Sequence, residues 1–224
     1  MASTPLLLFA FDRWVAPRLG QRRKGDYDQI DHGGNGIIIA GFGRFGQIVG
    51  RTLASRNIPF TALDRDPDHV DFVATFGNRI FYGDAGRLDL LRAAGAEEAA
   101  AIVVAVDDVD DSMRIVELCK QHFPQIKIYA RARNRRHAYR LMEMGCVQVF
   151  RESFASSLEA AEAVLVGVGF TTSSAANTVR RFRRHDEGLM EKAYSHHRDT
   201  DKLAALAREG RAELERLFEE DESR

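Results

Sequence analysis

From residue 36 onward, short apolar runs alternate with stretches whose apolar residues recur at helical spacing. The apolar runs, expected as strands, cover residues 36–41, 59–64, 78–85, 100–108, 126–132 and 147–153. The amphipathic stretches, expected as helices, cover residues 44–57, 67–77, 88–99, 110–123 and 135–145. Strands that alternate with helices in this way form right-handed βαβ units and a parallel sheet covered on both faces. The pattern therefore predicts an α/β fold with a doubly wound parallel sheet over residues 36–151.

After residue 151 the alternation stops and only helical patterns follow. Residues 153–169 are expected to form one helix, and the highly charged segment 201–220 a long solvated helix that pairs with another copy of the chain. We therefore divide the chain into a leading segment (1–35), a sheet domain (36–151) and a helical C-terminal extension (152–224).

The leading segment combines an apolar run and Trp14 with a basic cluster that follows them, Arg18, Arg22, Arg23 and Lys24. The run is too short to span a bilayer, and a signal peptide would place its basic residues before the run. Two interpretations stay open. One is the cytoplasmic end of a membrane helix followed by a polar linker, and the other is an amphipathic helix packed on its own domain.

Composition narrows the class of protein. The chain has 224 residues, 45% of them hydrophobic, which is enough for one well-cored domain and a smaller appendage. Its formal net charge of −1 gives no overall attraction to nucleic acid, and the arginines of 131–140 lack an accompanying aromatic stacking pattern. Cys119 and Cys146 form neither a disulfide framework nor a metal motif, which fits a reducing cytoplasm. We therefore expect no nucleic-acid partner and no metal.

The first strand runs into a glycine loop, Gly41-Phe42-Gly43-Arg44-Phe45-Gly46, and a helix follows at once. In this strand–loop–helix context the first glycine allows a tight turn, the second lets the backbone approach a phosphate, and the third lets helix and strand pack closely. The phosphate would meet free N–H groups at the helix N-terminus. The loop predicts a Rossmann-like nucleotide site.

Carboxylates follow three further strands, at the edge of the sheet where ligands bind in such folds. Asp64 is placed to accept a hydrogen bond from a ribose hydroxyl, and its carboxylate would repel a 2′-phosphate. This favours NAD(H) or an adenine mononucleotide over NADP(H). The neighbouring Arg65 is the one residue that speaks against this preference. Asp84 and Asp108 can either contact the ligand or cap helices. The residues expected to bind the nucleotide are Gly41, Phe42, Gly43, Arg44, Phe45, Gly46, Asp64, Arg65, Asp84, Ala85 and Asp107.

The sequence shows no sign of catalytic machinery. A nicotinamide oxidoreductase needs a general acid or base and a substrate pocket, and none of the five tyrosines belongs to a Tyr-x-x-x-Lys motif. The seven histidines fall mostly in polar helix or linker contexts. We expect no enzyme, and an NAD-dependent oxidoreductase is the alternative.

The motifs that extend beyond the glycine loop resemble one family. They are "IIIAGFGRFGQIVGR", "DRDPDHV", "FGNRIFYGDAGRLDLLRAAGAEEA", "VDD", "HFPQIKIYARARNRRHAYRLMEMG", "RESF" and "FRRH". Over about residues 36–190 the chain is similar to the cytoplasmic KTN/RCK regulatory domain of the Kef family, the glutathione-gated potassium efflux antiporters of the bacterial inner membrane.

The resemblance implies a ligand-binding gate without chemistry of its own. AMP or NAD(H) would sit on the glycine loop, and glutathione would bind between the subunits of a homodimer and hold the transporter closed, whereas glutathione S-conjugates open it. The helical extension would serve dimerisation and ligand sensing. The implied partners are the membrane antiporter domain of the same polypeptide and, as a candidate, an ancillary quinone-oxidoreductase-like subunit. A nucleotide-only RCK domain of another potassium channel or transporter is a further alternative.

By the same resemblance, the glutathione contacts fall on Arg51 and Arg151, and Phe76 is the aromatic residue that the bulk of an adduct displaces. Arginine forks are suited to the two carboxylates of glutathione. The family pattern has an asparagine where this chain has Asp186, which only accepts hydrogen bonds when ionised. This substitution bears directly on glutathione affinity.

Overall fold

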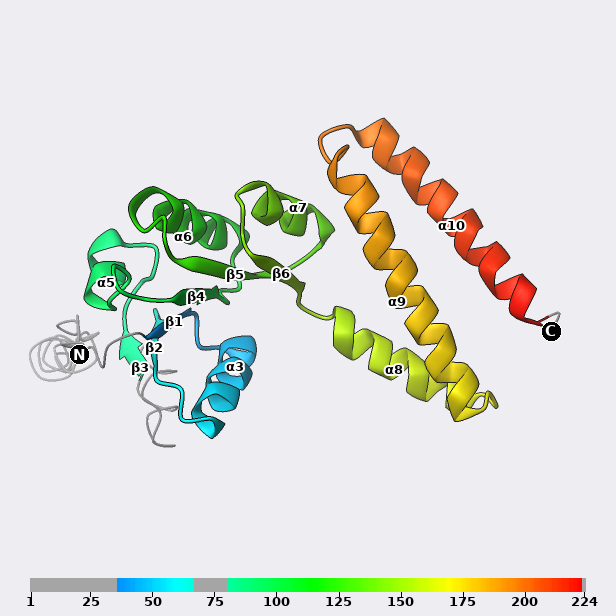
Figure 1. Ribbon diagram of the computed structural model, residues 1–224, viewed down its shortest axis with the longest axis horizontal. Coiled ribbons are helices and arrows are strands. Elements are labelled where there is room, and N and C mark those ends of the chain that lie inside the picture. Colours follow the sequence, from blue (N-terminus) through cyan, green and yellow to red (C-terminus); the bar gives the residue numbers. More distant parts are fainter. Residues whose placement is uncertain (1–35, 67–79, 223–224) are drawn as a thin grey trace, which may run out of the picture.

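The computed structural model describes residues 36–66 and 80–222, with side chains up to residue 216. Its centre is a six-stranded, fully parallel sheet in the order β3-β2-β1-β4-β5-β6 (Figure 1). The strands are β1 (Ile37–Ala40), β2 (Phe60–Asp64), β3 (Ile80–Tyr82), β4 (Ala101–Val104), β5 (Lys127–Ala132) and β6 (Gln148–Arg151). The predicted doubly wound sheet is confirmed, with its order reversing between β1 and β4.

Successive strand residues point to opposite faces of the sheet, and both faces are buried. Ile38 and Ala40 of β1 belong to one hydrophobic cluster, and Ile39 between them belongs to another. Helices cover both sides (Figure 1). They are α3 (Arg44–Ser55), packed on the second cluster, and α5 (Leu88–Ala93), α6 (Val109–His122) and α7 (Arg135–Glu143), packed on the first.

Three predicted elements differ from the structure in length. The helix expected over 88–99 ends at Ala93, because the chain turns through Gly95, whose φ is 83°. The strand expected over 100–108 is limited to Ala101–Val104, and the one over 78–85 to Ile80–Tyr82. The helix predicted over 67–77 lies outside the described residues.

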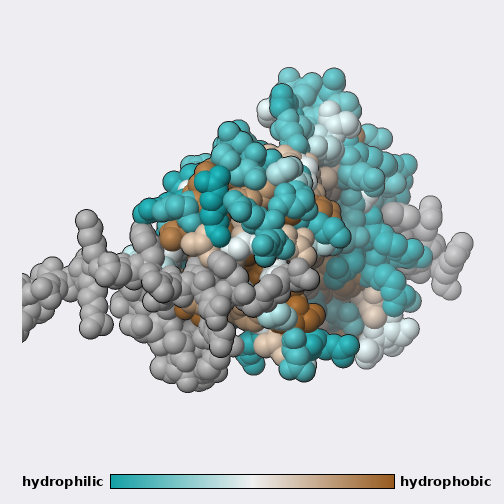
Figure 2. Space-filling model, turned by 60° about the vertical axis from the view of Figure 1, so that its left-hand side comes forward, coloured by the Kyte–Doolittle hydropathy of each residue, from teal (hydrophilic) through white to brown (hydrophobic). Residues whose placement is uncertain are grey.

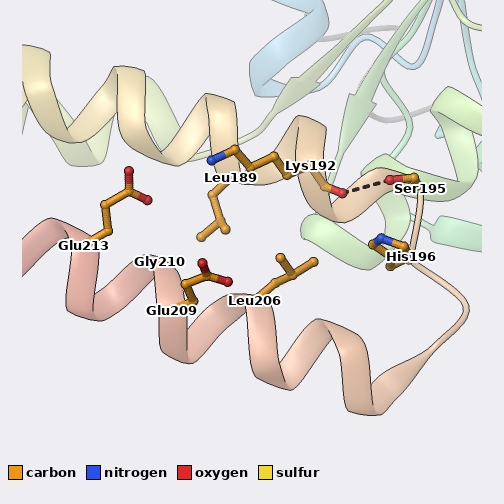
Figure 3. A pocket seen from close by; sticks show the side chains of 8 residues that line it. All are labelled: Leu189, Lys192, Ser195, His196, Leu206, Glu209, Gly210 and Glu213. Carbon is orange, nitrogen blue, oxygen red and sulfur yellow. Dashed lines mark hydrogen bonds between the residues drawn. The ribbon is translucent and has the colours of Figure 1, made fainter.

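The extension consists of three helices, α8 (Phe154–Gly167), α9 (Thr172–Tyr194) and α10 (Thr200–Glu222), and Figure 1 shows α10 folded back beside α9. The predicted long charged helix is confirmed as α10. In the described chain it lies against α9 of the same copy: Leu189 and Leu206 line a pocket between the two helices, and Gly210 leaves no room for a Cβ beside Leu189 (Figure 3). Met190 of α9 packs on the core of the sheet domain and joins the two parts.

The face drawn in Figure 2 is largely hydrophilic over the helices, with hydrophobic residues showing in patches between them. Among the described residues, no helix combines the length and apolar character needed to cross a bilayer.

Candidate functional site

Glycines shape the turn between β1 and α3. Gly41 takes a φ of 90°, and a Cβ there would lie 2.8 Å from the Val106 backbone nitrogen. A Cβ on Gly46 would lie 2.2 Å from the Gly41 carbonyl oxygen, so both positions need glycine for the fold itself. Gly43 differs, because a Cβ there would meet nothing within 4 Å. The open space in front of Gly43 is where a ligand can approach the backbone.

Helix α3 begins directly behind this space. Its N-cap is Gly43, and no side chain caps the first turn. The first N–H groups of a helix have no partner within the helix and carry the positive end of its dipole, which makes them a binding site for an anion. The sequence folds this way because glycine replaces the usual Ser, Thr or Asp of an N-cap.

Asp64, at the end of β2, is held against the glycine loop. Its Oδ2 accepts a 2.7 Å hydrogen bond from the Phe42 N–H, and its Oδ1 accepts one of 3.0 Å from the Asp66 N–H. The Phe42 side chain is fully buried and stacks on Phe60, with ring centroids 5.9 Å apart. Phe42 therefore contributes only its backbone to the surface of the glycine loop. The carboxylate therefore lies at the position that a Rossmann fold uses for the ribose.

A cleft of about 370 Å³ opens along this edge of the sheet. Eight of the eleven residues predicted to bind the nucleotide line it, and the other three, Phe42, Phe45 and Gly46, do not. The ring of Phe45 faces β6, with its centroid 6.4 Å from that of Phe150. Among the polar residues of this lining, sequence reasoning missed Gln47, Asp66 and Asp111. Asp111 could have been suspected, since the acidic stretch 107–111 begins shortly after β4 ends at Val104.

Asp84 and Asp108, for which the sequence allows either ligand contact or helix capping, play different roles in the structure. Asp108 is the N-cap of α6 and accepts from the N–H groups of Asp110 and Asp111, at 2.9 Å each. These two hydrogen bonds lower the pKa of the Asp108 carboxyl, and the one from the Asp111 N–H has the larger effect. Asp84 does not cap α5, whose N-cap is Arg87; its carboxylate accepts instead from the Gly86 N–H at 2.8 Å.

A row of charges connects the glycine loop with the end of β6. Arg131 is only 4% exposed and pairs with Asp107 and, at 3.5 Å, with Glu152. Glu152 lies 3.8 Å from the Arg44 guanidinium in the glycine loop. The hydrogen bond from Arg131 lowers the pKa of Asp107. These ion pairs of Arg131 tie the ends of β4 and β5 to the residue after β6.

Of the four residues predicted to contact glutathione, Arg151 and Asp186 are the two that the described part of the chain brings together. Arg151, at the end of β6, pairs with Asp186 on α9, and Arg135 pairs with the other oxygen of the same carboxylate. The Asp186 side chain is only 6% exposed, and the Arg151 guanidinium also lies 3.5 Å above the Phe154 ring centroid. Arg51 is exposed on α3, and within the described chain no contact joins it to this group. Phe76 lies outside the described residues.

A second cavity, of about 700 Å³, lies between α7 and the turn that joins α9 to α10, the α9–α10 corner (residues 195–199). Glu143 of α7 closes one side, since it pairs with Arg198 and lies 3.2 Å from the His197 ring. The His197 ring stacks on Tyr194, with centroids 5.5 Å apart. These contacts fix the corner of the extension against the sheet domain.

Both thiols are chemically quiet. Burial raises the pKa of Cys119 to about 12 and that of Cys146 to about 11. A thiol is nucleophilic and ligates metals as its thiolate, which these pKa values suppress. In the described part of the chain, His, Cys, Asp and Glu form no group able to hold a metal ion.

The parallel sheet and the cleft behind its glycine loop define a nucleotide-binding domain of the TrkA-N class, and the TrkA-N domain family model matches residues 37–152. The model of the potassium efflux system KefB C-terminal domain matches residues 156–224. A structure of the Shewanella denitrificans Kef CTD in AMP-bound form is 40% identical, covering 72% of this chain and 98% of that one, with a TM-score of 0.66. The chain belongs to the Kef family, as its KTN/RCK domain.

Two more distant structures share the fold. The TrkA-N domain of the inner membrane protein ybaL from Escherichia coli is 24% identical over 60% of this chain and 98% of its own, with a TM-score of 0.54. The GsuK channel bound to NAD is 19% identical over 71% of this chain and 29% of its own, with a TM-score of 0.55. At these identities the likeness supports the fold alone.

Proposed function

We propose that this chain is the cytoplasmic regulatory domain of a potassium:proton antiporter of the bacterial inner membrane. It binds AMP or NAD(H), and it closes the transporter with glutathione and opens it with glutathione S-conjugates. The observation that supports this best is the 40% identity to a Kef domain that holds AMP, together with a cleft lined by eight of the predicted nucleotide-binding residues. Its partners are a second copy, the membrane antiporter domain of the same polypeptide and an ancillary quinone-oxidoreductase-like subunit, with no nucleic acid.

The cleft supports an adenine nucleotide with an unmodified ribose. The uncapped N-terminus of α3 offers N–H groups to a phosphate, and Gly43 leaves the approach open. Asp64 faces the loop with an ionisable carboxylate that can accept from ribose hydroxyls. AMP and NADH both present these groups, so the geometry fits either.

The lining favours binding over catalysis. The described residues around the cleft include no His, Tyr, Lys or Cys, and their acid–base candidates are aspartates. Four of these aspartates already accept from backbone N–H groups or pair with arginines: Asp64, Asp84, Asp107 and Asp111. A regulatory nucleotide needs only to be held. We therefore propose that the domain is no enzyme.

A shared glutathione site explains why Arg51 and Arg151 do not meet within one copy. Across a two-fold axis, Arg51 of one subunit can complete the group around Arg151 of the other. Val164 and Val168, at the end of α8, are 63% and 70% exposed, and such residues suit the interface between two copies. Arginines on both sides would hold the carboxylates of the tripeptide.

One observation favours the alternative of a sensor that binds nucleotide alone. Asp186 already provides a carboxylate to Arg151 and Arg135, the interaction that a glutathione carboxylate would otherwise make. A ligand must therefore displace or share this partner, which weakens binding. We keep glutathione gating as the proposal and expect its affinity to be low.

Melting temperatures with AMP, NADH, glutathione and an S-conjugate test the proposal, because a ligand that binds only the folded state stabilises it. Gly43→Val should keep the fold and abolish stabilisation by AMP, since its Cβ has room but fills the phosphate approach. Gly46→Val is the contrasting variant and should unfold the domain. A Gly43→Val protein that binds AMP like the wild type would refute the nucleotide site, and stabilisation by neither glutathione nor the conjugate would leave the nucleotide-only sensor.

A further inference from the structure

The wall of the cleft next to Asp64 contains a chain of alternating charges. The Arg65 guanidinium pairs with one oxygen of Asp111, and the other oxygen accepts a 2.8 Å hydrogen bond from Arg114. Arg114 in turn lies 3.5 Å from Asp84. Asp111 thereby joins the ends of β2 and β3 to the first turn of α6.

This arrangement decides where the Arg65 side chain lies. Arg65 follows Asp64 directly, where Rossmann proteins that accept a 2′-phosphate carry an arginine, and it is 64% exposed in the cleft wall. A freely rotating arginine at this position would form a fork for a 2′-phosphate. Here its charge is directed at α6 and neutralised by a carboxylate that is only 20% exposed.

We infer that Asp111 is a specificity-determining residue, which withholds Arg65 from the ligand and so keeps the cleft selective for nucleotides with a free 2′-hydroxyl. The inference rests on the proposed nucleotide site and names a residue that sets its selectivity. Asp111 acts in two ways: it occupies the one arginine next to Asp64 on β2, and its own carboxylate adds negative charge to the wall. Both raise the free energy of a bound 2′-phosphate.

The test compares AMP with adenosine 2′,5′-bisphosphate, which differ only in the 2′-phosphate, by calorimetric titration of the whole chain. The wild type should prefer AMP. In Asp111→Asn, the ratio of the two dissociation constants should shift toward the bisphosphate by about tenfold or more, the usual gain from a charged hydrogen bond. NADH and NADPH should show the same direction.

Two controls isolate the mechanism. Asp110→Asn removes a neighbouring carboxylate of the same helical turn that does not line the cleft, and it should leave the ratio unchanged. Adding Arg65→Gln to Asp111→Asn should cancel most of the gain, because the freed arginine produces it. Asp111→Ala serves as a second variant, and melting curves verify that each protein is folded.

The outcomes separate this inference from the function on which it rests. A wild type that binds neither AMP nor NADH refutes the nucleotide site itself. A wild type that binds AMP, with a ratio that Asp111→Asn and Asp111→Ala leave unchanged, overturns the role of Asp111 alone. An equal shift in Asp110→Asn would mean that general charge, and not the Arg65–Asp111 pair, sets the preference.

Discussion

The sheet domain and the helical extension are stabilised in different ways. The sheet domain buries apolar side chains on both faces, and Ile39 and Ile102 in its central strands are fully buried. In the extension, α8 buries only Leu158 of its 14 residues, and two of the buried positions on α9 are Ala175 and the charged Asp186. The sheet domain thus has a core of its own, whereas the extension is attached by ion pairs, by Met190 and by ring contacts to Tyr139.

The exposed surface shows the same contrast. Four of the eight large hydrophobic residues that the described chain leaves exposed lie within seven consecutive residues, at the end of α8 and just after it: Val164, Val166, Val168 and Phe170. The nucleotide cleft is formed entirely within the sheet domain. The cleft is therefore complete within one chain, whereas we propose that a second copy completes the region for ligand sensing.

The largest effect is expected in the sheet core. Ile102→Ala in β4 should lower the free energy of unfolding by about 2–5 kcal/mol, because it leaves a cavity in a packed interior. Val147→Ala, at a residue that is 59% exposed beside the edge strand, should change it by less than about 0.5 kcal/mol. Urea denaturation followed by circular dichroism measures both. Equal effects would mean that the sheet is not the stable unit.

The next effect concerns the attachment of the extension. Asp186→Asn should lower the unfolding free energy by about 1–3 kcal/mol, because two guanidinium groups lose their charged partner. The same change should strengthen glutathione binding, since Arg151 becomes free for a ligand carboxylate. Glu187→Gln, at the exposed neighbouring position, is the matched control and should do neither. Titration calorimetry measures glutathione binding. If Asp186→Asn binds glutathione no better than the wild type, the proposed role of Arg151 in holding a glutathione carboxylate is contradicted.

A smaller effect is expected at the exposed end of α8. Val164→Ser combined with Val168→Ser should weaken dimerisation by at least about tenfold without lowering the stability of the sheet, because both valines are exposed in the single chain and would be buried only in the proposed dimer. Ile58→Ser, at an exposed residue before β2, tests for a nonspecific loss of apolar surface. Sedimentation velocity over a concentration series gives the dissociation constants. An unchanged dimer would move the interface elsewhere.

The smallest effect is a pH dependence within the sheet domain. The Arg131 hydrogen bond lowers the pKa of Asp107 in the folded state, so its contribution to stability is present above the unfolded pKa, about 3.9, and disappears as the pH falls through the folded value. Asp107→Asn should therefore flatten the acid loss of stability below about pH 5. Melting temperatures between pH 3 and 7 measure this. A variant with the wild-type slope would show that the pair contributes nothing.

Local patterns predicted the sheet domain well. The strands and the glycine turn each depend on residues that are close in sequence, and eight of the eleven residues predicted for the nucleotide line one cleft because parallel strands end at one edge. The cap at Asp108 was one of two roles that the sequence left open. Phe42 was placed at the nucleotide by its position in the loop, yet its side chain is buried. A loop motif specifies backbone geometry and does not show which way each side chain turns.

The sequence by itself determined the succession of strands and helices along the chain and the position of the glycine loop, because the period of apolar residues and the glycine spacing act over a few residues. The family was indicated by the resemblance of longer motifs. Only the tertiary structure decided the partners of the charges. Arg65 finds Asp111 across 46 positions, and Arg135 finds Asp186 across 51. Sequence spacing cannot indicate such pairs, because they form only when the sheet brings the ends of separate strands and helices together. An arginine that looks ready for a ligand in the sequence can already be neutralised in the fold.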